Sequence, residues 1–290
     1  MSSPKDSLPV YLALANDINM NYEIKQENAK KAFSVVINEQ NDSLNRVNLF
    51  KVANRYYNMN DFKSYREISK LVLDRSLQVK DSASAAKAYS YLGDYYSSEA
   101  ISDSAYRNYF KAQKIYTQIN DDLNLAKTLI SKATLQFNEG NFFESEIAVF
   151  KALEILNQEN NVNDKLYDCY NLLGILYNEK EEFDKALEYQ GKALKTLNDK
   201  SIPIDLQLKA TSLNNIGYIY INKNDYKKAI FYFEKGLNEK NLFKEKTYLY
   251  AMLLDNLGYA KFKSGKMEEL PDIFFRSLKI RDSLGLKTAT

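Results

Sequence analysis

The 290-residue sequence contains no histidine and a single cysteine, Cys169. Without histidine the chain has no Ser-His-Asp or Cys-His catalytic arrangement, no phospho-accepting histidine, and few ways to bind zinc or iron. One cysteine also excludes a disulfide framework within the chain. Because these absences remove the commonest catalytic and metal sites, we expect no enzymatic activity, no metal and no cofactor.

Glycine and proline are scarce, with nine and four residues, and 45% of the residues are hydrophobic. This composition predicts an almost entirely helical chain with short connections. No segment approaches the roughly 18 uncharged apolar residues of a membrane-spanning helix, and the N-terminus lacks the apolar core of a signal peptide. A glycine-rich phosphate loop is also missing, since Gly174, Gly217 and Gly258 stand singly within expected helices. We therefore expect no membrane contact by this chain.

Neither sign of charge is in excess: 40 basic and 38 acidic residues give a net charge of +2. The charges are dispersed along the sequence, whereas a nucleic-acid-binding surface needs a concentrated basic stripe. The sequence thus predicts no nucleic-acid partner.

What the sequence does contain is an internal repeat. The stretches that begin at Asn171 and Asn214 share the same order of apolar, aromatic and small residues over 24 positions. A small residue, called the anchor below, marks the same point of every copy, and successive anchors are 40 to 43 residues apart. The anchors are Ala53, Gly93, Ala133, Gly174, Gly217 and Gly258.

Each repeat is interpreted as a helix, a tight turn and a second helix. The small anchor allows the second helix to approach the first closely, and a tyrosine three residues later in four copies fills the gap between neighbouring units. Turn-forming residues stand between the two apolar runs at Asn60-Asp61, Gly140-Asn141, Asn224-Asp225 and Gly265.

This pattern resembles the tetratricopeptide repeat (TPR). The series Tyr89, Leu92, Gly93, Tyr96, Ala105, Tyr109 and Ala112 follows its signature almost completely. Two features depart from it, because no proline ends any repeat and the period exceeds the usual length of about 34 residues. Long-period repeats of this kind occur in kinesin light chain and in Gram-positive receptors for signalling peptides. The resemblance implies an all-α fold, a right-handed superhelical solenoid of about seven helix-turn-helix units.

We expect one continuous solenoid over residues 7–290, after a flexible start at residues 1–6. The next anchor would lie near position 299, so we expect the chain to be truncated at its C-terminus, although the second helix of the last unit could instead act as the cap. The predicted units are 7–40, 43–79, 82–119, 122–158, 163–198, 203–239 and 243–284.

The resemblance also places the first helices on a concave face that receives an extended peptide or a partner protein's helix. The positions around each anchor that would point there are rich in asparagine and tyrosine, and include two carboxylates, Asp94 and Asp255. The predicted peptide-binding residues are Asn54, Tyr57, Asn138, Asn171, Asn178, Asn214, Asn215, Tyr218, Asn222, Asn256 and Tyr259.

Two interpretations of these asparagines stay open. A row of carboxamides offers donors and acceptors that can hydrogen-bond the backbone of an extended peptide, while tyrosine rings add apolar contact. Alternatively, an asparagine before the anchor, as in L-N-N-I-G and L-D-N-L-G, hydrogen-bonds a neighbouring helix.

Several phrases, among them R-D-S-L-G-L-K, resemble the repeat regions of Bacteroidetes signalling proteins. In those proteins such arrays precede a membrane helix and a histidine-kinase or helix-turn-helix output. The resemblance implies a non-catalytic sensory or interaction region that is extracytoplasmic, with a cytoplasmic location as the alternative. Other readings are a stand-alone scaffold that assembles partner proteins and an intracellular peptide receptor that governs a DNA-binding partner.

Overall fold

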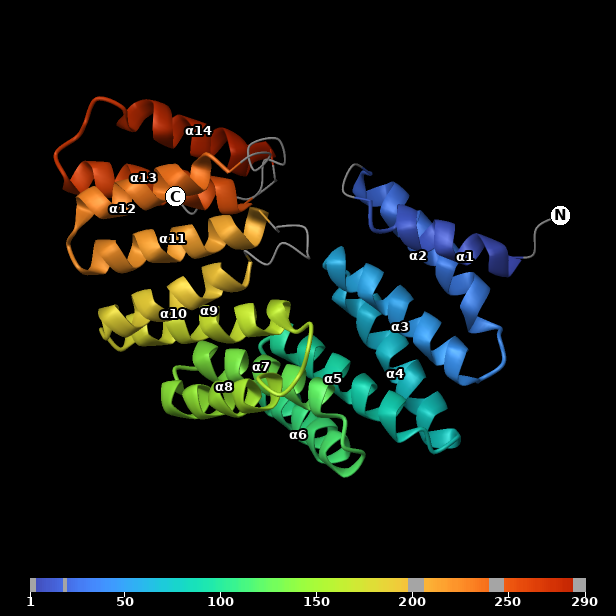
Figure 1. Ribbon diagram of the computed structural model, residues 1–290. Helices are drawn as coiled ribbons and strands as arrows, with labels where there is room; N and C mark the ends of the chain where they lie inside the picture. Colours follow the sequence, from blue (N-terminus) through green and yellow to red (C-terminus); the bar gives the residue numbers. More distant parts are fainter. Residues whose placement is uncertain (1–3, 18–19, 198–205, 240–247, 284–290) are drawn as a thin grey trace. The chain divides into compact units, whose positions relative to one another are not determined.

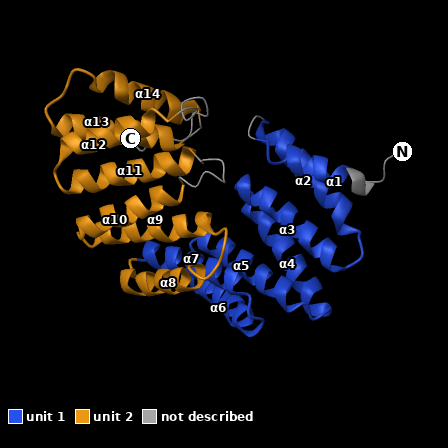
Figure 2. Ribbon diagram, viewed as in Figure 1, with its two compact units in different colours: residues 1–139 blue, residues 140–290 orange. Residues whose placement is uncertain are grey.

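The computed structural model describes residues 4–17, 20–197, 206–239 and 248–283. These residues form fourteen α-helices and no strand. The chain divides into two compact units, residues 1–139 and 140–290, which are described separately here (Figure 2). The boundary falls at the turn inside the predicted repeat 122–158.

The first unit contains seven helices (Figure 1). Helices that follow one another pack side by side, and the first helices of consecutive repeats also touch, α1 against α3 and α5 against α7. The helices are α1 Pro4–Leu14, α2 Tyr22–Ile37, α3 Ser43–Asn58, α4 Phe62–Gln78, α5 Ser82–Ser98, α6 Ser102–Gln118 and α7 Asp122–Asn138.

The second unit holds the other seven helices and shows the same arrangement, with α9 against α11 and α11 against α13. They are α8 Phe142–Leu156, α9 Asn163–Glu179, α10 Phe183–Thr196, α11 Leu206–Asn222, α12 Tyr226–Leu237, α13 Tyr248–Lys263 and α14 Leu270–Ser283.

The all-α prediction is confirmed. The division into seven units stays a prediction. Helix α1 begins at Pro4, inside the range 1–6 that was expected to be a flexible start. The predicted limits at 198, 203, 243 and 284, and the expected truncation after them, lie outside the described residues. A single solenoid over 7–290 stays a prediction.

The predicted turns are present and have a common backbone geometry. Asn60, Asn224, Gly140 and Gly265 all adopt positive φ angles between 58° and 79°. A residue in this left-handed conformation reverses the chain after a helix, and the next amide closes the turn. The N–H of Asp61, for example, donates to the carbonyl of Tyr56 at 2.9 Å. Asp61 then caps α4 by accepting from the Ser64 N–H at 3.0 Å.

The anchor glycines are explained by the residue sixteen positions later, on the second helix of the same repeat. A Cβ atom at Gly93 would lie 2.5 Å from the ring of Tyr109, and a Cβ at Gly217 would lie 2.5 Å from the ring of Phe233. Gly174 has the same relation to Gln190. Real carbon atoms do not approach so closely, so a large residue at the later position requires glycine at the anchor.

In the two repeats with an alanine anchor, the residue sixteen positions later is small enough to leave room for the alanine side chain. Their residues sixteen positions later are smaller, Ser69 after Ala53 and Val149 after Ala133. Anchor and later residue therefore vary together within this one chain, a relation that the sequence analysis did not extract.

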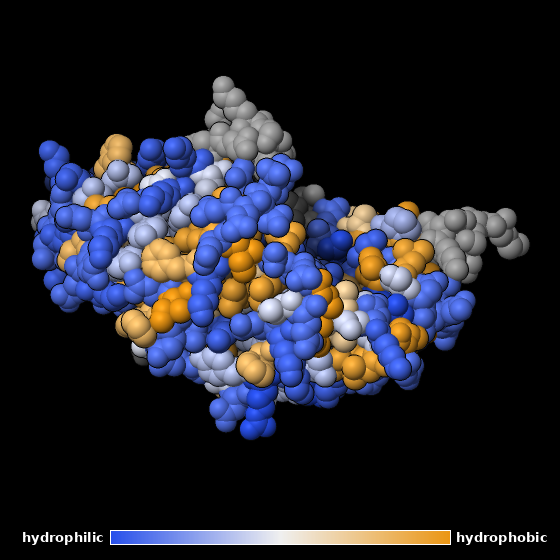
Figure 3. Space-filling view, turned by 60° about the horizontal axis from the view of Figure 1, so that its bottom comes forward, coloured by the Kyte–Doolittle hydropathy of each residue, from blue (hydrophilic) through white to orange (hydrophobic). Residues whose placement is uncertain are grey.

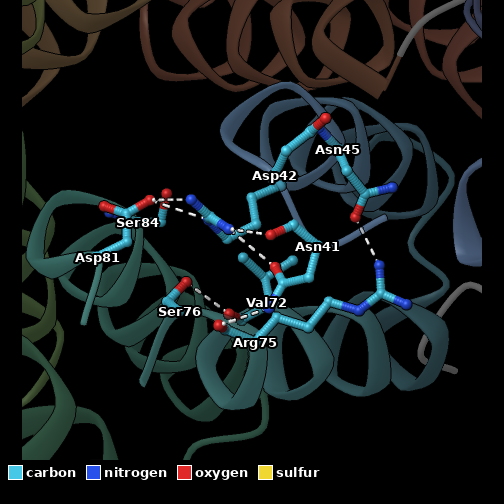
Figure 4. Close-up of polar contacts among 9 residues, drawn as sticks. Asn41, Asp42, Asn45, Val72, Arg75, Ser76, Asp81 and Ser84 are labelled. Carbon is cyan, nitrogen blue, oxygen red and sulfur yellow. Dashed lines mark hydrogen bonds and ion pairs between the residues drawn. The ribbon is translucent and has the colours of Figure 1, made fainter. Parts of the chain in front are cut away.

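A buried arginine joins three helices of the first unit. Arg46, on α3, is 5% exposed and forms an ion pair with Asp81, the N-cap of α5, at 2.9 Å. Its guanidinium also donates to the side chain of Asn41 at 2.8 Å. Asn41 in turn donates to the carbonyl of Arg75 near the end of α4 at 2.9 Å, and the labelled residues of this network converge in Figure 4. The network fixes the N-terminal ends of α3 and α5 against the C-terminal end of α4.

Candidate peptide-binding face

All eleven predicted binding residues lie on first helices, as expected from their spacing. Asn54 and Tyr57 are on α3 and Asn138 is on α7, all in the first unit. The second unit carries the rest: Asn171 and Asn178 on α9, Asn214, Asn215, Tyr218 and Asn222 on α11, and Asn256 and Tyr259 on α13.

In the second unit the asparagines are paired across neighbouring first helices. Asn215 donates from its Nδ2 to Oδ1 of Asn171 at 2.9 Å. The same bond joins Asn222 to Asn178 at 3.1 Å. Asn256 likewise donates to Asn214 at 2.9 Å. These three bonds join six of the predicted residues and link α9 to α11 and α11 to α13. This geometry follows the second interpretation, in which the carboxamides link helices.

Burial divides these asparagines further. Asn178 and Asn214 are 5% and 4% exposed, so the protein covers almost all of their surface. Asn171, Asn215 and Asn256 keep part of their surface exposed, and Asn222 is exposed. Because one carboxamide offers two donors and two acceptor lone pairs, the exposed members keep capacity for a further hydrogen bond.

The two predicted tyrosines of the second unit are nearly half exposed, and the Lys263 ammonium lies 5.6 Å from the ring centroid of Tyr259. Tyr218 is 45% exposed and Tyr259 is 44% exposed. A cavity of about 120 Å³ opens beside Tyr218 between α9 and α11. Asn178 and Asn215 also line it, so three predicted residues share one cavity.

A larger cavity of about 520 Å³ lies among α12, α13 and α14, where none of the eleven predicted residues contributes. Lys261 lines it at the position three residues after the anchor, which is tyrosine in four other repeats. The Lys261 side chain is 7% exposed, and its ammonium group pairs with Glu269, and with Glu234 at 3.2 Å. These ion pairs raise the pKa of Lys261 against the opposing effect of burial.

The first unit has a different arrangement, centred on the carboxylate of Asp94. The Tyr109 hydroxyl donates to Asp94 Oδ1 at 2.8 Å, and the hydroxyls of Ser131 and Tyr65 also bond to this carboxylate. Burial raises the pKa of Asp94 to about 6, although the three hydroxyl donors lower it. The side chain keeps part of its surface exposed.

Aromatic rings continue from this carboxylate along the same face. The rings of Tyr57 and Tyr65 are 5.0 Å apart, and Tyr65 stacks on Tyr91 at 5.3 Å. Asn54 hydrogen-bonds the Tyr91 hydroxyl, so this predicted residue supports the ring. Tyr57 is 42% exposed. Burial and the charge of Asp94 raise the pKa of Tyr57, because the two groups are close.

Asn138, the remaining predicted residue of the first unit, is exposed near the end of α7.

On the face drawn in Figure 3, hydrophobic residues form small patches that hydrophilic residues interrupt. Among the described residues, no helix is long and apolar enough to cross a membrane, and no group of three or more acidic or cysteine side chains could hold a metal ion.

Comparison with known families gives two matches, at residues 168–198 and 210–241. Both are to the tetratricopeptide repeat. They cover the two repeats that keep the sequence pattern best, α9 with α10 and α11 with α12. No curated protein matches the sequence of the chain at a significant level.

Solved structures share the fold at low sequence identity. A Rap protein in complex with Competence and Sporulation Factor is 14% identical, with a TM-score of 0.67 over 97% of this chain and 77% of that one. BtubC (BKLC) from P. vanneervenii is 20% identical, with a TM-score of 0.65 over 79% of this chain and 94% of that one. TPR-like repeats assigned to a kinesin light chain of Podospora anserina are 12% identical, with a TM-score of 0.56 over 69% and 96%.

The chain therefore contains TPR repeats in a TPR-like fold. This fold is typically a protein-interaction scaffold, and neither matched family model describes a catalytic family. The resemblance to Bacteroidetes proteins stays a prediction.

Proposed function

We propose that the chain binds an extended segment of a partner protein along its first helices. The observation that carries this proposal is the pair of exposed tyrosines on adjacent first helices, Tyr218 and Tyr259, beside carboxamides that have spare hydrogen-bonding capacity. Exposed tyrosine provides a large apolar contact and a hydroxyl at a low entropic cost, which makes it frequent in binding surfaces. The Rap protein of similar fold was solved with a bound factor, which adds support.

The test is a binding measurement on the whole chain with displayed random heptapeptides as the probe. Replacing Tyr218 and Tyr259 by alanine is expected to weaken binding of the selected peptides by tenfold or more, on the order of a hot-spot loss. The melting temperature should change little, because both rings are nearly half exposed. Phe231→Ala is the matched control, since this aromatic residue is 58% exposed on the second helix α12.

If the Phe231 variant loses as much binding as the double tyrosine variant, the first-helix face is not the binding surface. Asn214→Ala is a poor probe of binding here. Its side chain is buried and accepts the bond from Asn256, so its loss would affect the packing of α11 on α13.

We further propose that this binding serves signalling, with the chain as the sensory or interaction region of a larger bacterial protein with a histidine-kinase or helix-turn-helix output. A ligand that prefers one arrangement of the repeats would shift their population and pass the change along the chain. The alternative is a stand-alone scaffold. Reading the gene beyond both ends of this sequence separates them: a kinase or helix-turn-helix region supports signalling, and a stop codon with no output region supports the scaffold.

A further inference from the structure

The carboxylate of Asp94 lacks a positively charged partner. Among the described residues no lysine or arginine nitrogen lies within 4 Å of it, and its hydrogen bonds come from neutral hydroxyls, including that of Tyr109 at 2.8 Å. A carboxylate surrounded by protein but unpaired with a cation is unfavourable for folding, because its solvation by water is only partly replaced. Such a group is more readily explained by a ligand than by stability.

Aromatic rings beside Asp94 add a second, independent feature. Tyr57, Tyr65 and Tyr91 form a continuous set with neighbouring centroids 5.0 and 5.3 Å apart. Of these rings Tyr57 is the exposed one, and the charge of Asp94 contributes to the raised pKa of its hydroxyl. Tyrosine ring faces attract cations, most strongly where water is partly excluded.

The same aromatic set already accepts a lysine of this chain at its other end. The Lys87 ammonium lies 4.6 Å from the ring centroid of Phe50 and 5.7 Å from that of Tyr91. Lys87 precedes Asp94 by seven residues on α5, which places both on one side of the helix about two turns apart. Within the described part of the chain, one end of the set therefore holds an ammonium group without a carboxylate, and the other end holds a carboxylate without a cation.

We infer that Asp94, together with the rings of Tyr57, Tyr65 and Tyr91, forms a subsite that accepts a cationic side chain, lysine or arginine, of the bound partner segment. The inference rests on the proposed peptide-binding function and specifies what the first unit recognises. The carboxylate supplies the opposite charge, and the exposed ring of Tyr57 covers the aliphatic stem of the incoming side chain. Asp94 is the residue that selects for a positively charged side chain, and the rings contribute to affinity.

The test uses peptide selection by the wild-type chain, by Asp94→Asn and by Asp74→Asn. Asn keeps the size and an acceptor oxygen but removes the charge. Asp74 is an exposed acid on α4 of the same unit, so its variant controls for the change in net charge. The probe is a library of displayed random heptapeptides.

Wild type and Asp74→Asn are expected to enrich lysine or arginine at one peptide position, and Asp94→Asn is expected to lose that preference. A selected peptide should bind wild type on the order of tenfold more tightly than the same peptide with norleucine at that position. Peptides selected without a cationic preference would overturn the subsite and leave the proposed function intact. Failure of the wild-type chain to select any peptide would overturn both.

A second readout separates recognition from a structural role. The groups that act on Asp94 are Tyr57 from α3, Tyr65 from α4, Tyr91 from α5, Tyr109 and Tyr116 from α6 and Ser131 from α7. Burial raises the pKa of each of these tyrosines, so all stay neutral below pH 8. Because the pKa of Asp94 is raised in the folded state, the fold is stabilised by its protonated form and loses that stability as pH rises from about 4 through 6. Asp94→Asn should therefore melt at a higher temperature than wild type at pH 7.5, and the difference should shrink as pH falls and disappear below about pH 4. A lower melting temperature at pH 7.5 would identify Asp94 as a structural acceptor and overturn the inference.

Discussion

Arg46 shows how much of the first unit depends on a single buried charge. Its guanidinium pairs with Asp81 and bonds to Asn41, and Asp81 also accepts from the Ser84 N–H at 3.0 Å to cap α5. Burial alone would raise the pKa of Asp81, but the bonds from Ser84 and the Arg46 charge outweigh it, so the pKa is lowered. The paired arginine therefore stabilises the fold most where Asp81 is ionised.

Replacing Arg46 by methionine is expected to cost about 3–5 kcal/mol of unfolding free energy at pH 7, because Asp81 is left without its partner. A lowered pKa contributes stability above the unfolded value of about 3.9 and loses it as pH falls through the folded value. The difference in unfolding free energy between wild type and the Arg46 variant should therefore shrink below about pH 4. Urea denaturation at several pH values measures this difference. Arg107→Met, at an exposed site on α6, is the control. A difference that stays constant down to pH 2.5 would contradict the role given to the ion pair.

At the scale of helices, close packing within a repeat depends on the pairing of the anchor with the residue sixteen positions later. Gly217→Ala should cost about 1–3 kcal/mol, since its methyl group would overlap the ring of Phe233, which is fully buried. Gly191→Ala is the control, because nothing lies within 4 Å of its Cβ position, and at this exposed position of α10 alanine favours the helix by up to about 1 kcal/mol.

Adding Phe233→Val to Gly217→Ala reproduces the combination found at Ala133 and Val149. The double variant is expected to lose less stability than the sum of the two single variants, as a thermal or chemical denaturation cycle would show. Strict additivity would mean that the contact between these positions does not determine the choice of glycine.

The helices and turns could be predicted from the sequence because their signals are local. Apolar spacing and a left-handed residue such as Asn60 or Asn224 depend on a few neighbouring positions. The partners of polar side chains could not be predicted, since Arg46 and Asp81 are 35 residues apart in sequence. Spacing placed Asn171 and Asn215 on first helices, but it could not show that their side chains bond to each other. Similarly, spacing placed Asp94 and Tyr57 on the first helices, but it could not show that the hydroxyls of Tyr65 and Tyr109 bond to the Asp94 carboxylate.

For the whole molecule, a repeat array is stabilised mainly by contacts between successive elements. Local damage should therefore spread to adjacent repeats before it reaches distant ones. Hydrogen exchange of the Gly217→Ala variant is expected to show lost protection in α11, α12 and their neighbours α10 and α13, while α3 and α4 keep wild-type protection. Equal loss of protection in every helix would show instead that the chain unfolds as one cooperative body.

The relation between anchor and later residue also limits how such a gene can change. A crossover that joins the first helix of one repeat to the second helix of another would place an alanine anchor under a phenylalanine, or a glycine over a serine. The first product is overcrowded and the second contains a void, so both are selected against. Exchange of complete helical hairpins keeps each matched pair, so we expect an array like this one to lengthen by duplication of whole hairpins.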